Sequence, residues 1–189
     1  MALQKKVDKW KLKKWFTVYA PKEFNNTVIG EMPANEDKDA IGRTVKVGLD
    51  TITHNPSHAY TNVKFKIVSV DGTAAHTKLV VMEQLNSYIR SLVRRYRSIA
   101  STVQTLKTKD NIEVVAKLIA VTRGRTAHSK IRGIRKEMEG IVASYINDND
   151  MNTIISTINE GKLQSDIAAR LNHIAAINRV EVKKLEVKQ

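Results

Sequence analysis

The order in which two hydrophobic periodicities follow each other is the feature that most constrains this chain. Through the first half, apolar side chains tend to alternate with polar ones, which is typical of half-buried strands. The segments that predict such strands are 15–20, 27–32, 43–49, 63–70 and 77–82. Asp71-Gly72 is a tight-turn dipeptide between the last two segments, so this pair predicts a β-hairpin.

From position 85 the apolar spacing changes to three and four residues, which predicts amphipathic helices. One stripe runs from Leu85 to Ile99 and a second runs from Ile131 to Tyr145. Two shorter stripes at 151–158 and 167–174 predict two further helices. Apolar, β-branched residues return at 111–122 and 180–187, and both segments are expected to be strands.

Strands thus dominate the first half and helices the second, an α+β order and not a repeating βαβ order. About seven short strands favour a β-barrel or a strongly curved sheet with flanking amphipathic helices, in a single domain over residues 15–189. Residues 1–14 differ, because they hold six lysines, one acid and few apolar residues, and so predict a basic N-terminal arm that is disordered in isolation. These lysines are Lys5, Lys6, Lys9, Lys11, Lys13 and Lys14.

The charge of the chain points to a polyanionic partner. Thirty-two lysines and arginines against nineteen acids leave a formal charge of +13, and a compact domain with this excess repels itself. Residues 123–136 carry six cations, no acid and a flexible glycine, which suits contact with several phosphates. These cations are Arg123, Arg125, Lys130, Arg132, Arg135 and Lys136. The arginines of 90–97 leave two interpretations open, an exposed helix face or a further RNA contact.

The aromatic residues predict the style of RNA recognition. They make up only 5% of the chain, and Trp15, Phe16 and Tyr19 have a strand spacing suited to packing. The sequence has no aromatic platform of the RRM type, no KH-type Gly-x-x-Gly loop and no zinc knuckle. We therefore expect folded RNA to be recognised by its backbone and shape, and not through unpaired bases.

Motifs that carry catalysis are not found in the sequence. The chain has no cysteine, which excludes disulfides, thiolate nucleophiles and cysteine-based metal sites. His54 and His58 flank Pro56 without the glutamate of a helical zinc motif, and Gly161-Lys162 lacks the other residues of a P-loop. We expect no enzymatic activity, no metal, no cofactor and no small-molecule substrate. No apolar run is long enough for a transmembrane helix and no signal peptide is evident, so a cytoplasmic protein with no membrane partner is expected.

Three separated blocks of sequence resemble one family of small-subunit ribosomal proteins, which archaea and eukaryotes share. The blocks are Lys13–Pro21 with Phe24 and Ile29-Gly30, then Ile41–Leu49, then Lys130–Met138. The family is called S-three-A-e, or e-type S-one. The resemblance extends from about Lys13 to Val187 in the expected order and spacing, and the compact length is of the archaeal type.

The resemblance implies a β-barrel with packed helices, docked on the platform of the small (30S) subunit near the mRNA exit channel. It implies 16S-type rRNA near its 3′ end and neighbouring ribosomal proteins as partners, with mRNA at the exit channel as a further one. Arg43 and the segment 123–136 match the family by position as rRNA-facing residues. The lysines of the arm are added on charge alone.

Three other functions compete with this one. A standalone RNA-binding regulator of translation or transcription would purify as a free protein, whereas a ribosomal protein sediments with small subunits. An RNA-modifying enzyme would need a cofactor pocket. A membrane-surface protein would need a basic amphipathic helix with aromatic anchors, yet both tryptophans lie at the edge of the first predicted strand.

Overall fold

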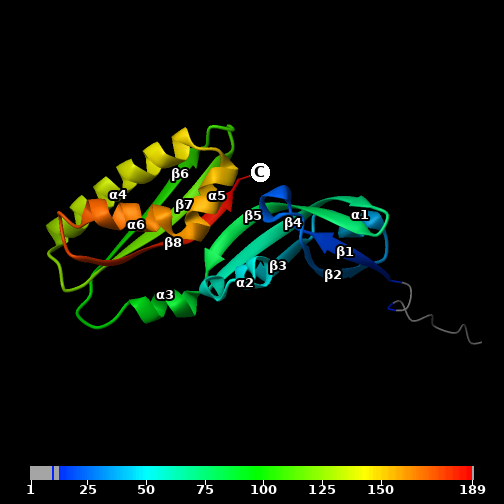
Figure 1. The fold of residues 1–189 in the computed structure, drawn as a ribbon, viewed down its shortest axis with the longest axis horizontal. Coiled ribbons are helices and arrows are strands. Elements are labelled where there is room, and N and C mark those ends of the chain that lie inside the picture. Colours follow the sequence, from blue (N-terminus) through cyan, green and yellow to red (C-terminus); the bar gives the residue numbers. More distant parts are fainter. Residues whose placement is uncertain (1–9, 11–12, 189) are drawn as a thin grey trace, which may run out of the picture. The chain divides into compact units, whose positions relative to one another are not determined.

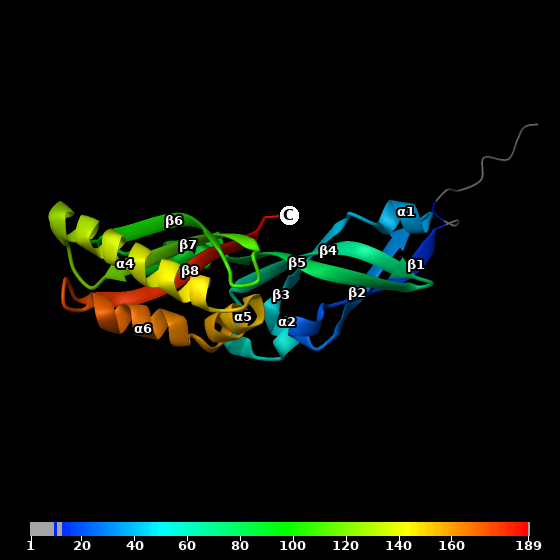
Figure 2. The same cartoon turned by 90° about the horizontal axis from the view of Figure 1, so that it is seen from above.

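The computed structural model describes residue 10 and residues 13–188, which form an α+β fold (Figures 1 and 2). The strands are β1 (Lys14–Tyr19), β2 (Val28–Ala34), β3 (Thr44–Gly48), β4 (Thr61–Asp71), β5 (Ala74–Gln84), β6 (Ile99–Lys107), β7 (Glu113–Thr122) and β8 (Ile177–Val187). The helices are α1 (Asp37–Ala40), α2 (Leu49–Thr53), α3 (Asn86–Leu92), α4 (His128–Asp148), α5 (Met151–Glu160) and α6 (Lys162–Leu171), with 3-10 turns η1 (Lys22–Phe24) and η2 (Pro56–His58). The predicted α+β order is confirmed.

The chain divides into two compact units. The first unit comprises Met1–Val47 and Lys64–Leu79, and the second comprises Gly48–Val63 and Val80–Gln189. The two long strands β4 and β5 therefore each belong to both units. The expectation that residues 15–189 form a single domain stays a prediction.

The first unit is built around β1. This strand pairs antiparallel with β2 and parallel with the start of β5, while β4 pairs with both β5 and β3. Since side chains alternate across a strand, Phe16 and Val18 of β1 face the core, where they pack with Ile67 and Ala75. Phe24 of η1 packs edge-to-face on Phe65 in the same unit, with the ring centres 5.4 Å apart.

The second unit is a four-stranded antiparallel arrangement in the order β5-β8-β7-β6, with helices α4, α5 and α6 over one face (Figure 1). Ile134 and Met138 of α4 and Ile167 of α6 are fully buried, as the predicted stripes require. Ile89 of α3 packs on Ile119 in a separate cluster. Every residue of β7 from Leu118 to Thr122 is buried, because helices cover both faces of the strand here.

The predicted helix from Leu85 to Ile99 is wrong in its second half. Helix α3 ends at Leu92, and Ile99 begins strand β6. Tyr96 has a φ of +66°, a left-handed conformation that an α-helix cannot continue through, and its side chain is exposed. The sequence does not show the alternation expected of a strand in β6. Its inward side chains Ala100 and Thr102 are small or polar, whereas the apolar Val103 points to solvent.

Of the two expected arrangements, a β-barrel or a strongly curved sheet, the barrel is not confirmed, because the sheet is not closed. Within the described residues the strand order is β2-β1-β5-β4-β3 in the first unit and β5-β8-β7-β6 in the second, and the outermost strands of each order do not pair with each other. There are eight strands in this part of the chain, where about seven were expected. The additional strand is β6, for which the sequence pattern predicts no strand.

Candidate nucleic-acid interface

The basic segment 123–136 forms the connection from β7 to α4 and the first turns of that helix. In α4, Ile134 and Met138 lie four residues apart and face the sheet, so Lys130, Arg132 and Lys136 fall on the outer side of the helix. Five of the six predicted cations are exposed: Arg123, Arg125, Lys130, Arg132 and Lys136. Arg135 is half-buried, and its Nε atom is covered without a hydrogen-bond partner.

A second basic segment lies beside the first. The connection from α3 to β6 carries Arg94 and Arg95, both exposed, and Arg97, whose Nη1 donates to the Leu92 carbonyl at 3.4 Å. The sequence left the role of these arginines open, because a helical stripe would have spread them around a helix. In the structure Arg94, Arg95 and Arg97 lie in a loop that reaches the β7–α4 connection.

Ser98 and Thr122 join the two connections. The Thr122 hydroxyl accepts a hydrogen bond from the Ser98 backbone N–H at 3.0 Å, and the Thr126 N–H donates to Ser98 Oγ at 3.0 Å. The single proton of the Thr122 hydroxyl has two acceptors in reach, the Gly124 carbonyl at 2.7 Å and the Ser98 carbonyl at 3.1 Å. Thr122 is only 1% exposed, so these bonds lie away from competing water. We call Ser98, Thr122, Gly124 and Thr126 the loop clasp.

A third connection, from α6 to β8, completes this end of the second unit. The Arg123 N–H donates to the Ala176 carbonyl at 2.9 Å. Figure 1 shows the three connections at the same end of strands β6, β7 and β8. Residues 85–98 and 123–136 contain no acid, so the cations they carry face no neutralising carboxylate from their own segments. This basic end can place several charges against one polyanion.

The remaining predicted site residues belong to the first unit or fall outside the description. Lys14 is exposed at the start of β1, and Lys13 holds its Nζ 4.2 Å from the centre of the Trp10 ring. Arg43 is exposed and donates from Nη1 to the Pro33 carbonyl at 3.1 Å. Lys5, Lys6, Lys9 and Lys11 lie outside the described residues. The predicted residues that the structure describes are therefore divided between the two units, with Lys13, Lys14 and Arg43 in the first and the segment 123–136 in the second.

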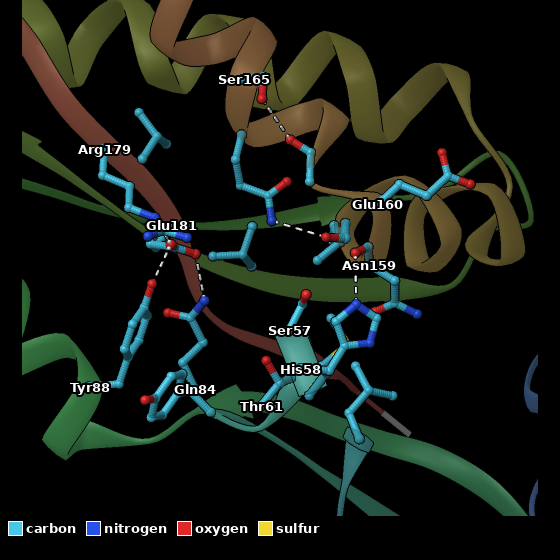
Figure 3. A pocket seen from close by; sticks show the side chains of 18 of the residues that line it. Ser57, His58, Thr61, Gln84, Tyr88, Asn159, Glu160, Ser165, Arg179 and Glu181 are labelled. Atoms are coloured by element: carbon cyan, nitrogen blue, oxygen red, sulfur yellow. Dashed lines mark hydrogen bonds and ion pairs between the residues drawn. The ribbon is translucent and has the colours of Figure 1, made fainter. Parts of the chain in front are cut away.

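A cavity of about 450 Å³ lies in the second unit (Figure 3). Glu181 of β8 is buried in its wall, where it accepts hydrogen bonds from Gln84 Nε2 at 2.6 Å and from the Tyr88 hydroxyl at 3.0 Å, and pairs with Arg179. Burial, together with the nearby Glu181 carboxylate, raises the pKa of Tyr88 to about 12. Tyr88 therefore stays protonated and serves as a donor. This network is not visible in the sequence, since a single glutamate between Val180 and Val182 resembles an exposed strand position.

The histidine in the same cavity is also held by the fold. His58 has Nδ1 at 3.1 Å from Thr53 Oγ1 and Nε2 at 3.1 Å from the Asn159 carbonyl oxygen, so both ring nitrogens are engaged. Tyr60 stacks on Tyr88 with ring centres 4.6 Å apart. These contacts connect η2 to α2 and α5 and connect Tyr60, just after η2, to α3, and we assign the cavity a structural role. In residue 10 and residues 13–188, no cluster of three or more histidines and carboxylates could hold a metal ion.

No helix in the part of the chain that the structure describes is both long enough and apolar enough to cross a membrane.

Comparison with known proteins adds independent evidence. A family model described as the ribosomal S3Ae family matches residues 2–189. The small ribosomal subunit protein eS1 of Pyrobaculum neutrophilum is 35% identical over 96% of this chain and 82% of its own length. The proteins of the same name from Sulfurisphaera tokodaii and Haloarcula marismortui are each 34% identical, over 95% and 91% of this chain and 93% and 81% of their own lengths.

Proposed function

The chain belongs to the ribosomal S3Ae family, and from this premise we propose that it is a structural constituent of the small ribosomal subunit that binds rRNA through the basic end of its second unit. The observation that carries the proposal is the loop clasp, which joins two basic connections 24 residues apart in sequence. It brings Arg94, Arg95, Arg123 and Arg125 to one end of the sheet. The family of structural ribosomal proteins supports a role without catalysis.

The chemistry of this end suits double-stranded or folded RNA. Arginine offers a planar set of donors that matches a phosphate in two-point contact, and four exposed arginines on two joined loops can span neighbouring phosphates. Contacts of this kind position a protein on RNA without selecting a base sequence. Each phosphate neutralised also releases counterions, so binding should weaken steeply with salt.

The finer assignment follows the family resemblance. We propose that the protein lies on the platform near the mRNA exit channel, contacts 16S-type rRNA near its 3′ end, and touches neighbouring small-subunit proteins and mRNA there. Its location would then be the ribosome in the cytoplasm. Arg43, Lys13 and Lys14 of the first unit supply further cations, and Lys5, Lys6, Lys9 and Lys11 are included on charge alone.

The salt dependence of binding tests the basic end. Replacing Arg123, Arg125 and Arg132 by glutamine removes three charges while keeping polar side chains at these positions. If each meets a phosphate, the slope of log affinity against log salt for an rRNA fragment should shrink by roughly two to three units. The affinities for matched and scrambled RNA helices should fall together, and the fold should survive, because all three side chains are exposed.

A matched control uses Lys107, Lys109 and Lys183, which are exposed in the second unit and lie away from the loop clasp. Replacing these three by glutamine removes the same charge, and the slope should change by less than one unit. Binding isotherms at four or more salt concentrations compare the two triple variants. Equal changes in both would mean that net charge, and not the basic end, governs binding.

A further inference from the structure

Both tryptophans of this chain are exposed, although Trp15 has a strand spacing suited to packing. Trp15 is 54% and Trp10 is 58% accessible to solvent. The strand fixes this outcome for Trp15, because Phe16 and Val18 take the inward positions of β1 and the alternation turns Trp15 outward. Large aromatic side chains gain most from burial, so two exposed tryptophans side by side indicate a surface that a partner covers.

The two rings form one surface. Their centres are 6.5 Å apart and their planes meet at 86°, an edge-to-face contact that orders both side chains while most of their area stays open. In the β1–β2 register Trp15 lies directly opposite Pro33. The Pro33 carbonyl is the acceptor for Arg43, so this guanidinium is held at the same place on the strand pair.

The charges around this surface indicate what the partner is. Lys13 lies over the Trp10 ring, and Lys14 directly precedes Trp15 in the chain. An apolar protein segment would have to desolvate these ammonium groups, whereas a nucleic acid offers phosphates to the lysines and flat bases to the rings. The acids at 36–39 lie close to Arg43 in the chain and repel phosphates. We therefore expect the phosphates of the RNA to contact Lys13 and Lys14.

We propose that Trp10 and Trp15 form a stacking surface for unpaired nucleotides of RNA, with Lys13 and Lys14 contacting the adjoining phosphates. This rests on the proposed rRNA-binding function and adds a second mode to it. The basic end of the second unit binds backbone and shape, as the sequence predicted. The tryptophan surface of the first unit binds unpaired bases, a mode that the sequence analysis did not expect. Stacking depends little on sequence, because every base has a π face.

Intrinsic fluorescence gives a readout confined to this surface, since the chain has two tryptophans and both belong to it. The full chain is titrated with an unstructured single-stranded RNA and with an RNA duplex of equal length. Single-stranded RNA should quench the emission, and the duplex should bind with much less quenching. Trp15→Leu keeps an apolar side chain but removes the π face, and should weaken single-strand binding roughly tenfold while leaving duplex binding unchanged.

Trp15→Phe retains a ring and should keep most of the single-strand affinity, which separates stacking from general hydrophobic contact. If Trp15→Leu binds the single strand as well as the wild type does, or if no quenching occurs although the duplex binds, the stacking proposal fails and the proposed function stands. If neither RNA binds, the proposed function itself fails. Circular dichroism confirms that the variants are folded.

Discussion

At the scale of single residues, Thr122 decides whether the two basic connections act together. Its buried hydroxyl is the centre of the loop clasp, since it bonds Ser98 and reaches the Gly124 carbonyl. Thr122→Val keeps the volume and removes the hydroxyl, leaving the Ser98 N–H without this partner. We expect a loss of about 1–3 kcal/mol in the free energy of unfolding. RNA binding should weaken roughly three- to tenfold although no charge is lost, because ordering each loose side chain on binding costs about 0.5–1.5 kcal/mol.

Thr108 offers a matched control for this variant. It is also buried, and its hydroxyl bonds the backbone of Ile112 in the connection from β6 to β7, in the same unit as the loop clasp. Thr108→Val should lower stability without changing affinity for RNA. Urea unfolding and RNA-binding isotherms of both variants make the comparison. If the two variants lose affinity equally, the effect follows from stability alone and the loop clasp has no special role.

Site residues could be predicted from the sequence only where they lie next to one another in the chain. The run of cations at 123–136 identified one half of the basic end, because its members are contiguous. The part played by Arg94 and Arg95 was not readable, since the Ser98–Thr122 bonds join residues 24 positions apart. Trp15 was misjudged for a related reason: an aromatic residue in a strand can face either side, and only the burial of Phe16 settles which side is the core.

At the scale of elements, α4 and α3 differ in how firmly they are held. Ile134 of α4 is fully buried against the sheet, whereas Leu92 of α3 is only partly buried beside Ile89 and Val121. Ile134→Ala should therefore cost about 2–5 kcal/mol, because it leaves a cavity that the packed helix cannot fill. Leu92→Ala should cost less, about 1–2 kcal/mol, since much of its side chain already meets water.

Urea unfolding followed by far-ultraviolet circular dichroism measures both losses, and unchanged slopes would show that the variants unfold like the wild type. Equal losses would contradict the packing described here, as would a loss below about 0.5 kcal/mol for Ile134→Ala.

Most other elements could be predicted from hydrophobic periodicity, among them the β4–β5 hairpin at Asp71-Gly72 and the break at Gly161, which has a φ of +74° between α5 and α6. Strand β6 could not be found that way, because packing against α4 favours small side chains on its inner face.

At the scale of the whole molecule, the family membership and the two cation groups support one account. With a charge of +13, the cations of the free protein repel one another. In a ribosomal site, rRNA phosphates neutralise part of this charge. Among the described residues each unit carries exposed cations, Lys14 and Arg43 in the first and the basic end in the second. The α+β class, the family and the basic segment could be predicted from the sequence. The open strand order, the loop clasp and the exposed tryptophans needed the structure.

Sedimentation tests the central claim most directly. A lysate of the cells that make this protein is separated on a sucrose gradient at low magnesium, so that ribosomal subunits run apart, and each fraction is probed for the chain. A structural constituent of the small subunit should peak with the small-subunit rRNA and be absent from the large-subunit peak. High salt should release it toward the top of the gradient, because phosphate contacts weaken as salt rises. Recovery only in the free-protein fractions at low salt would contradict the account and favour a standalone RNA-binding regulator.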